Sequence, residues 1–130
     1  MADAVRHDDD PDVDWFWDVI EEASRSRDRL GEILGQLPKG AVYRFQDLFL
    51  DFAAELQDEP YLSHLGPDES EDGLEDAANW VVSQGRATYE AVLDEPSRMP
   101  SHIDVFDPAN LGGLAYEVYY HRFGETLDLI

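Results

Sequence analysis

The acidic run from residue 68 to residue 73, DESEDG, is the stretch whose spacing comes nearest to a metal-binding motif. Its acids and final glycine are similar to the start of a calcium loop, D-x-[DN]-x-[DN]-G, which supplies oxygen ligands. A bidentate glutamate closes such a loop at the twelfth position, but that position is Asn79 here. The apolar residues from Leu74 onwards also predict a helix that begins inside the supposed loop. We therefore expect no calcium site.

Other patterns that carry catalysis or hold cofactors are missing from the chain. It has no cysteine, and no two of its histidines share an H-x-x-x-H spacing, so a zinc site has no ligand set; they are His7, His64, His102 and His121. No G-x-S-x-G elbow, G-x-G-x-x-G turn or G-x-x-x-x-G-K-[ST] loop occurs. The sequence therefore predicts no catalytic residue, no metal site and no cofactor, and it disfavours an enzyme without excluding one.

The charge balance gives the first hypothesis about function. The chain has 30 acidic and 9 basic residues, a formal net charge of −21, and no Lys or Arg occurs between Arg44 and Arg86. Nucleic acid and anionic membranes are poor partners for such a chain, whereas a basic protein is attracted to it. We expect a non-enzymatic interaction or regulatory module that binds a basic partner. The candidate surface is Asp68, Glu69, Glu71, Asp72, Glu75 and Asp76.

Two alternatives belong to other classes of protein. The first is a small-ligand-binding protein or an enzyme with a pocket lined by Trp80, Arg86, Tyr89 and His64. The second is a nucleic-acid mimic, which needs carboxylates spaced like phosphates along an extended face. The acidic cluster also has a purely structural explanation, because the helix macrodipole favours negative charge at a helix start.

The central stretch, residues 68–99, predicts two helices. The first carries a wide apolar face, made of Leu74, Ala77, Ala78, Val81 and Val82, with Trp80 at its flank. Gly85 is placed where a left-handed residue would end that helix. Residues 86–94 then predict a short second helix, which the prolines at positions 96 and 100 end.

Three amphipathic helices are predicted before this stretch. Asp14 is the candidate N-cap of the first, which covers residues 14–25. Apolar residues at i, i+3, i+4 and i+7 predict the second over residues 30–37. The third, over residues 41–57, has the most regular apolar stripe of the chain. We expect this third helix to lie at the centre of the fold.

The last helix is predicted from Asp107 to Phe123. Asp107 followed by Pro108 is typical of an N-cap and a first-turn proline. Gly124 is placed to end the helix. Apolar side chains extend around most of its circumference, which is typical of a central helix or of one in an oligomer contact, and we expect this helix, too, at the centre of the fold.

The predicted fold class is all-α, a single compact domain of five or six helices over residues 13–130. Residues 1–12 are acidic and predict a disordered tail. No alternating strand pattern competes with the helices. The N-terminus lacks the apolar segment of a signal peptide, and no apolar run is long enough for a membrane span. We expect a cytoplasmic protein with no membrane partner.

Three segments resemble a bacterial family of unknown function, DUF4240: FWDVIEEA at residues 16–23, FQDLFLDF at 45–52, and residues 71–99. The family pattern D-D-G-F…W-L-I-x-x-G-R is matched in part by Asp72, Gly73 and Leu74, then by Trp80, Val81 and Val82, and directly by Gly85 and Arg86. The resemblance extends from about Asp14 to Gly124, and residues 58–71 depart from it because an aromatic-rich segment is shortened. It implies a small helical protein, sometimes joined to a WGR domain, and it implies no activity.

Overall fold

The computed structural model describes residues 11–61, 71–100 and 110–127. Within these ranges the chain is helical and contains no strand, so the predicted all-α class is confirmed. The elements are α1 (Pro11–Ala23), α2 (Arg27–Leu34), α3 (Lys39–Glu55), α4 (Glu71–Ser83), α5 (Arg86–Asp94), the short 3-10 helix η4 (Pro96–Arg98) and α6 (Leu114–Phe123).

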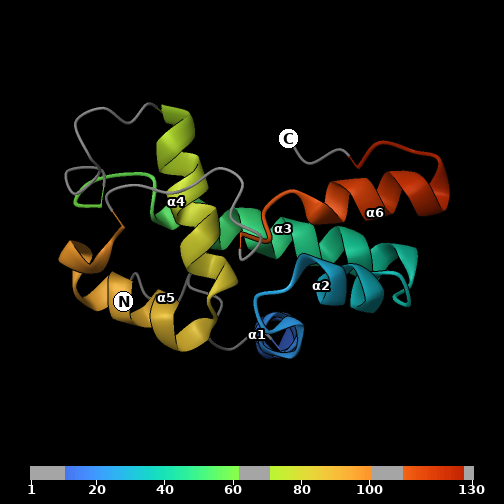
Figure 1. Cartoon of the computed structure of the whole chain (residues 1–130), viewed down its shortest axis with the longest axis horizontal. Helices are drawn as coiled ribbons and strands as arrows, with labels where there is room; N and C mark the ends of the chain where they lie inside the picture. Colours follow the sequence, from blue (N-terminus) through green and yellow to red (C-terminus); the bar gives the residue numbers. More distant parts are fainter. Residues whose placement is uncertain (1–10, 62–70, 101–109, 128–130) are drawn as a thin grey trace.

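Helix α3 forms the centre of the fold, as predicted. It contacts α1, α4 and α6, and Figure 1 shows it running through the middle of the molecule with α6 along one side. Its apolar stripe is buried at Val42, Phe45, Leu48, Phe49 and Ala53. A stripe at this spacing places one side of the helix against its neighbours along the whole length of the helix.

An aromatic cluster joins α1, α3 and α5. The ring of Phe16 lies 4.9 Å from that of Phe45, and the ring of Trp17 lies 4.9 Å from that of Phe52 and 5.4 Å from that of Tyr89, measured between centroids. Phe16 and Trp17 are almost completely buried. Aromatic side chains bury large areas, and their pairing adds to that stabilisation, so this cluster holds the three helices together.

The predicted helix pair of the central stretch is confirmed. All five residues of the predicted apolar face of α4 are buried, and α5 covers residues 86–94 as predicted. Gly85, between the two helices, has a φ of +113° and a ψ of 171°, a conformation that is open almost only to glycine. Only Gln84 and Gly85 connect α4 to α5.

The predicted start of the first helix is wrong. Helix α1 begins at Pro11, so Asp14 lies in its first turn rather than at its N-cap. A proline is well suited to that position, because its missing N–H would have no helical partner there. Of the predicted tail, residues 1–10 lie outside the described residues, and Pro11 and Asp12 belong to α1.

The predicted start and position of the last helix are also wrong. Helix α6 begins at Leu114, after Gly113 with a φ of +84°, and the residues from Asn110 to Gly113 are not helical. The proposed start signal at Asp107 and Pro108 lies outside the described residues. The helix packs on α2 and α3 at one edge of the fold (Figure 1), and Tyr120 is 59% exposed. Such a helix is not a central element.

None of the described helices combines the length and the low charge that crossing a membrane requires.

Candidate functional site

The candidate acidic surface lies partly in the described part of the chain. Glu71 and Asp72 are the first two residues of α4, Glu75 is exposed one turn later, and Asp76 is half-buried. Asp68 and Glu69 lie outside the described residues. The acids from Glu71 to Asp76 thus lie at the N-terminal end of α4, where the macrodipole stabilises negative charge.

Three residues of the candidate pocket lie in the described part of the chain, Trp80 on α4 and Arg86 and Tyr89 on α5. Tyr89 is a core residue, and its hydroxyl donates a hydrogen bond to the carbonyl oxygen of Phe52 at 2.9 Å. Trp80 lines a shallow, mainly apolar hollow of about 360 Å³ with Ala87, Ala91 and Arg98. Neither Tyr89 nor Arg86 lines this hollow, and His64 lies outside the described residues.

The junction of α4 and α5 is held by a carboxylate from α1. The Oε2 atom of Glu21 accepts a hydrogen bond from the backbone nitrogen of Arg86 at 3.2 Å and so caps the start of α5. A Cβ atom on Gly85 would collide with the same carboxylate. Glycine is therefore required at this position for its backbone conformation and for the space that Glu21 occupies.

Arg86 ties α5 to α1 through its side chain. Its Nη1 atom donates to Asp14 at 2.9 Å, and its Nε atom donates to Glu90 at 3.0 Å. The hydrogen bonds to Asp14 and then to Glu90 raise the pKa of the Arg86 guanidinium. Gly85 and Arg86, the pair that matches the family pattern, thus have a structural role, because both contribute to the packing of α5 against α1.

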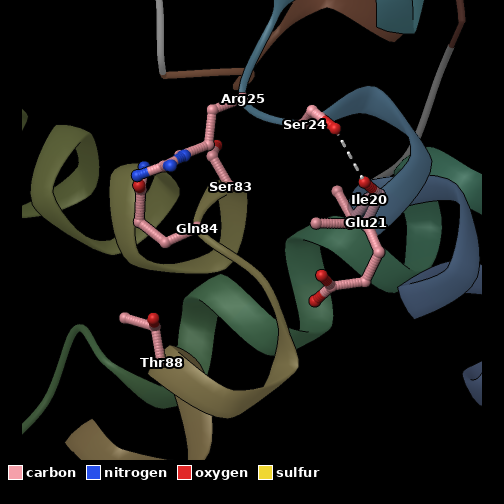
Figure 2. A pocket seen from close by; sticks show the side chains of 7 residues that line it. All are labelled: Ile20, Glu21, Ser24, Arg25, Ser83, Gln84 and Thr88. Atoms are coloured by element: carbon pink, nitrogen blue, oxygen red, sulfur yellow. Dashed lines mark hydrogen bonds between the residues drawn. The ribbon is translucent and has the colours of Figure 1, made fainter.

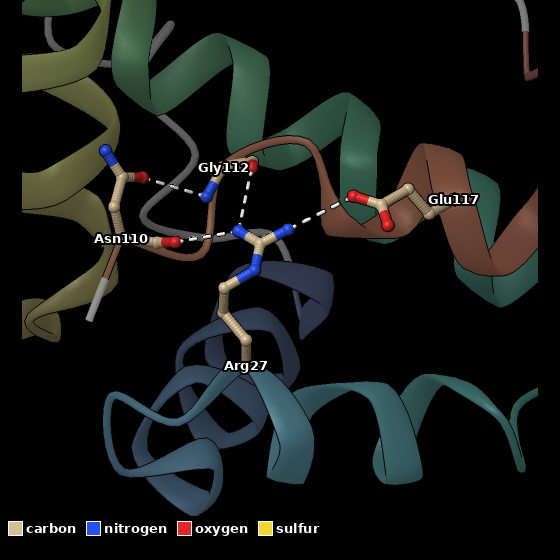
Figure 3. A network of polar contacts seen from close by, with 4 residues as sticks. All are labelled: Arg27, Asn110, Gly112 and Glu117. Atoms are coloured by element: carbon tan, nitrogen blue, oxygen red, sulfur yellow. Dashed lines mark hydrogen bonds and ion pairs between the residues drawn. The ribbon is translucent and has the colours of Figure 1, made fainter. Parts of the chain in front are cut away.

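A second arginine joins the start of α2 to the segment before α6. The Nη1 atom of Arg27 donates to the carbonyl oxygens of Asn110 at 2.8 Å and Gly112 at 3.2 Å, and its Nη2 atom donates to Glu117 at 3.2 Å. Figure 3 shows the guanidinium between these three partners. The planar fork of arginine suits several acceptors at once, so Arg27 fixes the turn that precedes α6.

The outer end of α6 is tied to the region around the α2–α3 connection. Arg122 donates to the carbonyl oxygens of Leu34 and Leu37. Lys39 donates to Glu125 at 2.7 Å and lies 5.7 Å from the ring centroid of Tyr119 and 5.6 Å from that of Phe123. The hydrogen bond to Glu125 raises the pKa of the Lys39 amine despite some desolvation.

Most basic side chains of the described residues therefore form ion pairs or hydrogen bonds within the fold. Of the nine basic residues, all but Arg6 lie in the described part, and among these eight only Arg25 has neither an acidic nor a carbonyl partner. Seven exposed carboxylates in the described part have no cation at ion-pair distance: Asp18, Glu21, Asp28, Glu55, Asp58, Glu75 and Asp94. The sequence shows the excess of acid, but it does not show which acids stay unpaired.

Among the described residues, no three His, Asp or Glu side chains lie close enough together to hold a metal ion. Every buried side-chain nitrogen or oxygen there has a hydrogen-bond partner. Ser83 is an example, because its hydroxyl donates to the carbonyl oxygen of Asn79 at 2.7 Å and accepts from the backbone nitrogen of Leu111 at 2.8 Å. The hydrogen bonds within the fold thus satisfy the buried polar side-chain atoms of the described core.

A comparison with known families finds that residues 12–125 match the model of DUF4240, described as a protein of unknown function. This confirms the resemblance inferred from the sequence. No curated protein and no solved structure matches the chain.

Proposed function

The chain is a member of the DUF4240 family, and we propose that it is a non-enzymatic interaction module that binds a basic partner protein. The observation that supports this is the set of seven exposed carboxylates without a cation, Glu75 among them, while almost all cations of the described residues are engaged. Unpaired charges of one sign on a surface create a potential that attracts a partner of opposite sign. We place this function in the cytoplasm.

Helix ends provide a second line of support. None of the helices from α1 to α5 has a basic residue in its last turn, and α3 and α5 end on acids, at Glu55 and Asp94. The hydroxyl of Tyr61 donates to the carbonyl oxygen of Leu93 at 3.3 Å, which ties the segment after α3 to the end of α5. Acids at a helix C-terminus oppose the macrodipole, so these two carboxylates add to the negative charge that the chain does not balance itself.

The surface that we propose for the partner is the acidic stretch at the start of α4: Asp68, Glu69, Glu71, Asp72, Glu75 and Asp76. No Lys or Arg lies in the sequence between Arg44 and Arg86, so residues near this stretch in the chain offer no positive charge. Binding that relies on such exposed charges weakens as salt concentration rises, because mobile ions screen it.

The test is affinity capture of partners from source-cell lysate at low salt, comparing the natural chain with two charge-reversed variants. The surface variant carries Asp72→Lys and Glu75→Lys. The control variant carries Asp18→Lys and Asp28→Lys, which changes the net charge by the same amount, and Asp28 also lies in the first turn of a helix. Circular dichroism establishes that both variants fold.

We expect one basic protein to bind the natural chain and the control, to be lost with the surface variant, and to be released by a high-salt wash. Equal binding by both variants would contradict the proposed surface. A partner that survives high salt, or the absence of any partner, would contradict the interaction proposal and favour the ligand-binding or enzymatic alternative.

The other two hypotheses stay predictions. A ligand pocket around Trp80 has a physical basis in the hollow beside that side chain, but Arg86 and Tyr89 do not contribute to it. The unpaired carboxylates of the described part are distributed over several helices rather than gathered in one loop, which is compatible with a nucleic-acid mimic. Capture of a DNA-binding protein that DNA displaces would favour the mimic.

A further inference from the structure

A polar hollow of about 390 Å³ lies where the ends of α1 and α4 meet the start of α5. It is lined by Glu21, Ser24, Arg25, Gln84 and Thr88, together with parts of the neighbouring helices. Figure 2 shows these side chains around the hollow. Its volume is at the lower end of the range of about 300–1,000 Å³ that small-molecule sites occupy. It is separate from the acidic start of α4.

Arg25 is the unusual residue of this hollow. It is exposed, and no carboxylate of the described part pairs with it, although carboxylates greatly outnumber cations in this chain. Its backbone has a φ of +62°, and that of Ser24 has a φ of +51°. Residues other than glycine adopt this left-handed conformation at a cost in free energy, and two in succession hold the Arg25 side chain at the edge of the hollow.

Glu21 supplies the opposite charge. One of its carboxylate oxygens, Oε2, accepts from the backbone nitrogen of Arg86, and a carboxylate has further acceptor capacity on its two oxygens. In Figure 2 the Glu21 carboxylate and the Arg25 guanidinium lie on different sides of the hollow. Gln84 donates its amide nitrogen to the carbonyl oxygen of Trp80 at 3.1 Å, which leaves its amide oxygen as an acceptor.

We propose that this hollow binds a small zwitterion of amino-acid size, with the ligand carboxylate on Arg25 and the ligand ammonium group on Glu21. A simple anion is repelled by Glu21 and by the net charge of −21, and a simple cation is repelled by Arg25. A ligand that carries both charges meets an opposite charge at each side. Arginine binds carboxylates through a two-pronged hydrogen bond, which gives this ligand a fixed orientation.

The experiment is a nuclear magnetic resonance titration of the ¹⁵N-labelled full chain with each of the common amino acids at millimolar concentration. Acetate and methylammonium, which carry one charge each, are the reference compounds. We expect at least one amino acid to give saturable shifts of the amide signals of Ser24, Arg25, Gln84 and Thr88. Neither reference compound is expected to shift them at the same concentration.

Two variants decide whether Arg25 carries the binding. Arg25→Asn removes the cation while keeping a residue that tolerates the left-handed backbone. It should weaken binding at least about tenfold, because a charge-assisted hydrogen-bond pair is lost. Arg29→Gln, which removes a cation that pairs with Glu22 and Glu32, should leave binding unchanged.

Three results would overturn the proposal: no amino acid shifts the signals of the hollow, acetate shifts them as strongly, or Arg25→Asn binds as well as the natural chain. The proposal does not depend on a basic partner, since the start of α4 and this hollow share no residue.

Discussion

The carboxylate of Glu21 occupies the space in which a side chain at Gly85 would lie, and its Oε2 atom accepts a hydrogen bond from the backbone nitrogen of Arg86. One glycine thus allows α1 to approach the start of α5 closely enough to cap it. The sequence pattern around Gly85 and Arg86 is therefore explained by the close packing of α1 against α5, and it needs no catalytic role as an explanation.

Gly85→Ala should lower the free energy of unfolding by about 1–3 kcal/mol, because the backbone conformation at φ +113° is strained for alanine and the new methyl group displaces Glu21. Urea unfolding followed by circular dichroism measures the change. Gly40→Ala in α3 is the control, since nothing lies within 4 Å of the added methyl group there, and it should be neutral or stabilise by up to about 1 kcal/mol. Equal stability of the two variants would contradict the close-approach argument.

Arg27→Lys should lower the free energy of unfolding by about 1–3 kcal/mol. Lysine keeps the positive charge, but its single ammonium group cannot donate to all three acceptors of Arg27 at once, which are the carbonyl oxygens of Asn110 and Gly112 and the carboxylate of Glu117. Hydrogen exchange should become faster in α6, whose preceding turn Arg27 holds. The matched change is Arg29→Lys, at a more exposed arginine with ion pairs on both sides. It should shift the stability by less than about 1 kcal/mol. If both variants lose the same amount, the fork geometry of Arg27 is not the cause.

Ser83→Ala should cost about 1–3 kcal/mol, because it leaves the backbone N–H of Leu111 buried without an acceptor. The hydroxyl that is removed is 2.8 Å from that nitrogen, and Ser83 is 1% exposed. Thermal unfolding is a suitable measurement, with Ser97→Ala on the exposed part of η4 as the reference substitution. A Ser83→Ala protein as stable as the Ser97→Ala protein would show that another acceptor replaces the hydroxyl.

The pKa of Lys39 should lie above the ordinary lysine value of 10.5, because the hydrogen bond to Glu125 stabilises the charged amine. Since the folded-state pKa is raised, the stabilisation from this contact is fully present below pH 10.5 and is lost as the pH rises through the folded-state pKa. Lys39 is the single lysine of the chain, so its side-chain resonance can be followed without overlap from other lysines. In Glu125→Gln the pKa should move back toward the ordinary value, and an unchanged pKa would refute the assignment.

Local signals in the sequence predicted much of the fold. The bounds of α5 followed from Gly85 before it and Pro96 after it, and the buried face of α4 followed from its apolar spacing. Both features depend on residues near one another in the chain, where turn chemistry and periodicity act directly.

Features set by distant contacts could not be predicted in the same way. The start of α6 follows a turn in which Asn110 donates to the carbonyl oxygen of Asp76 and accepts from the backbone nitrogen of Gly112. Tyr89, a candidate pocket residue, is in the core because Trp17 and Phe52 pack against it. Neither partner is near it in the chain, so helical spacing alone did not show that Tyr89 would be enclosed.

Side-chain hydrogen bonds join the region of α2 and the start of α3 to the region of α6, and their long sequence separation matters for folding during protein synthesis. Arg27 is 83 residues from Asn110, Lys39 is 86 residues from Glu125, and the carbonyl of Leu34 is 88 residues from Arg122. A ribosome releases the chain from its N-terminus, so α2 emerges long before any of these partners exists. These particular contacts therefore form only after the α6 region has left the exit tunnel, and the long loop closures involved favour a late folding step.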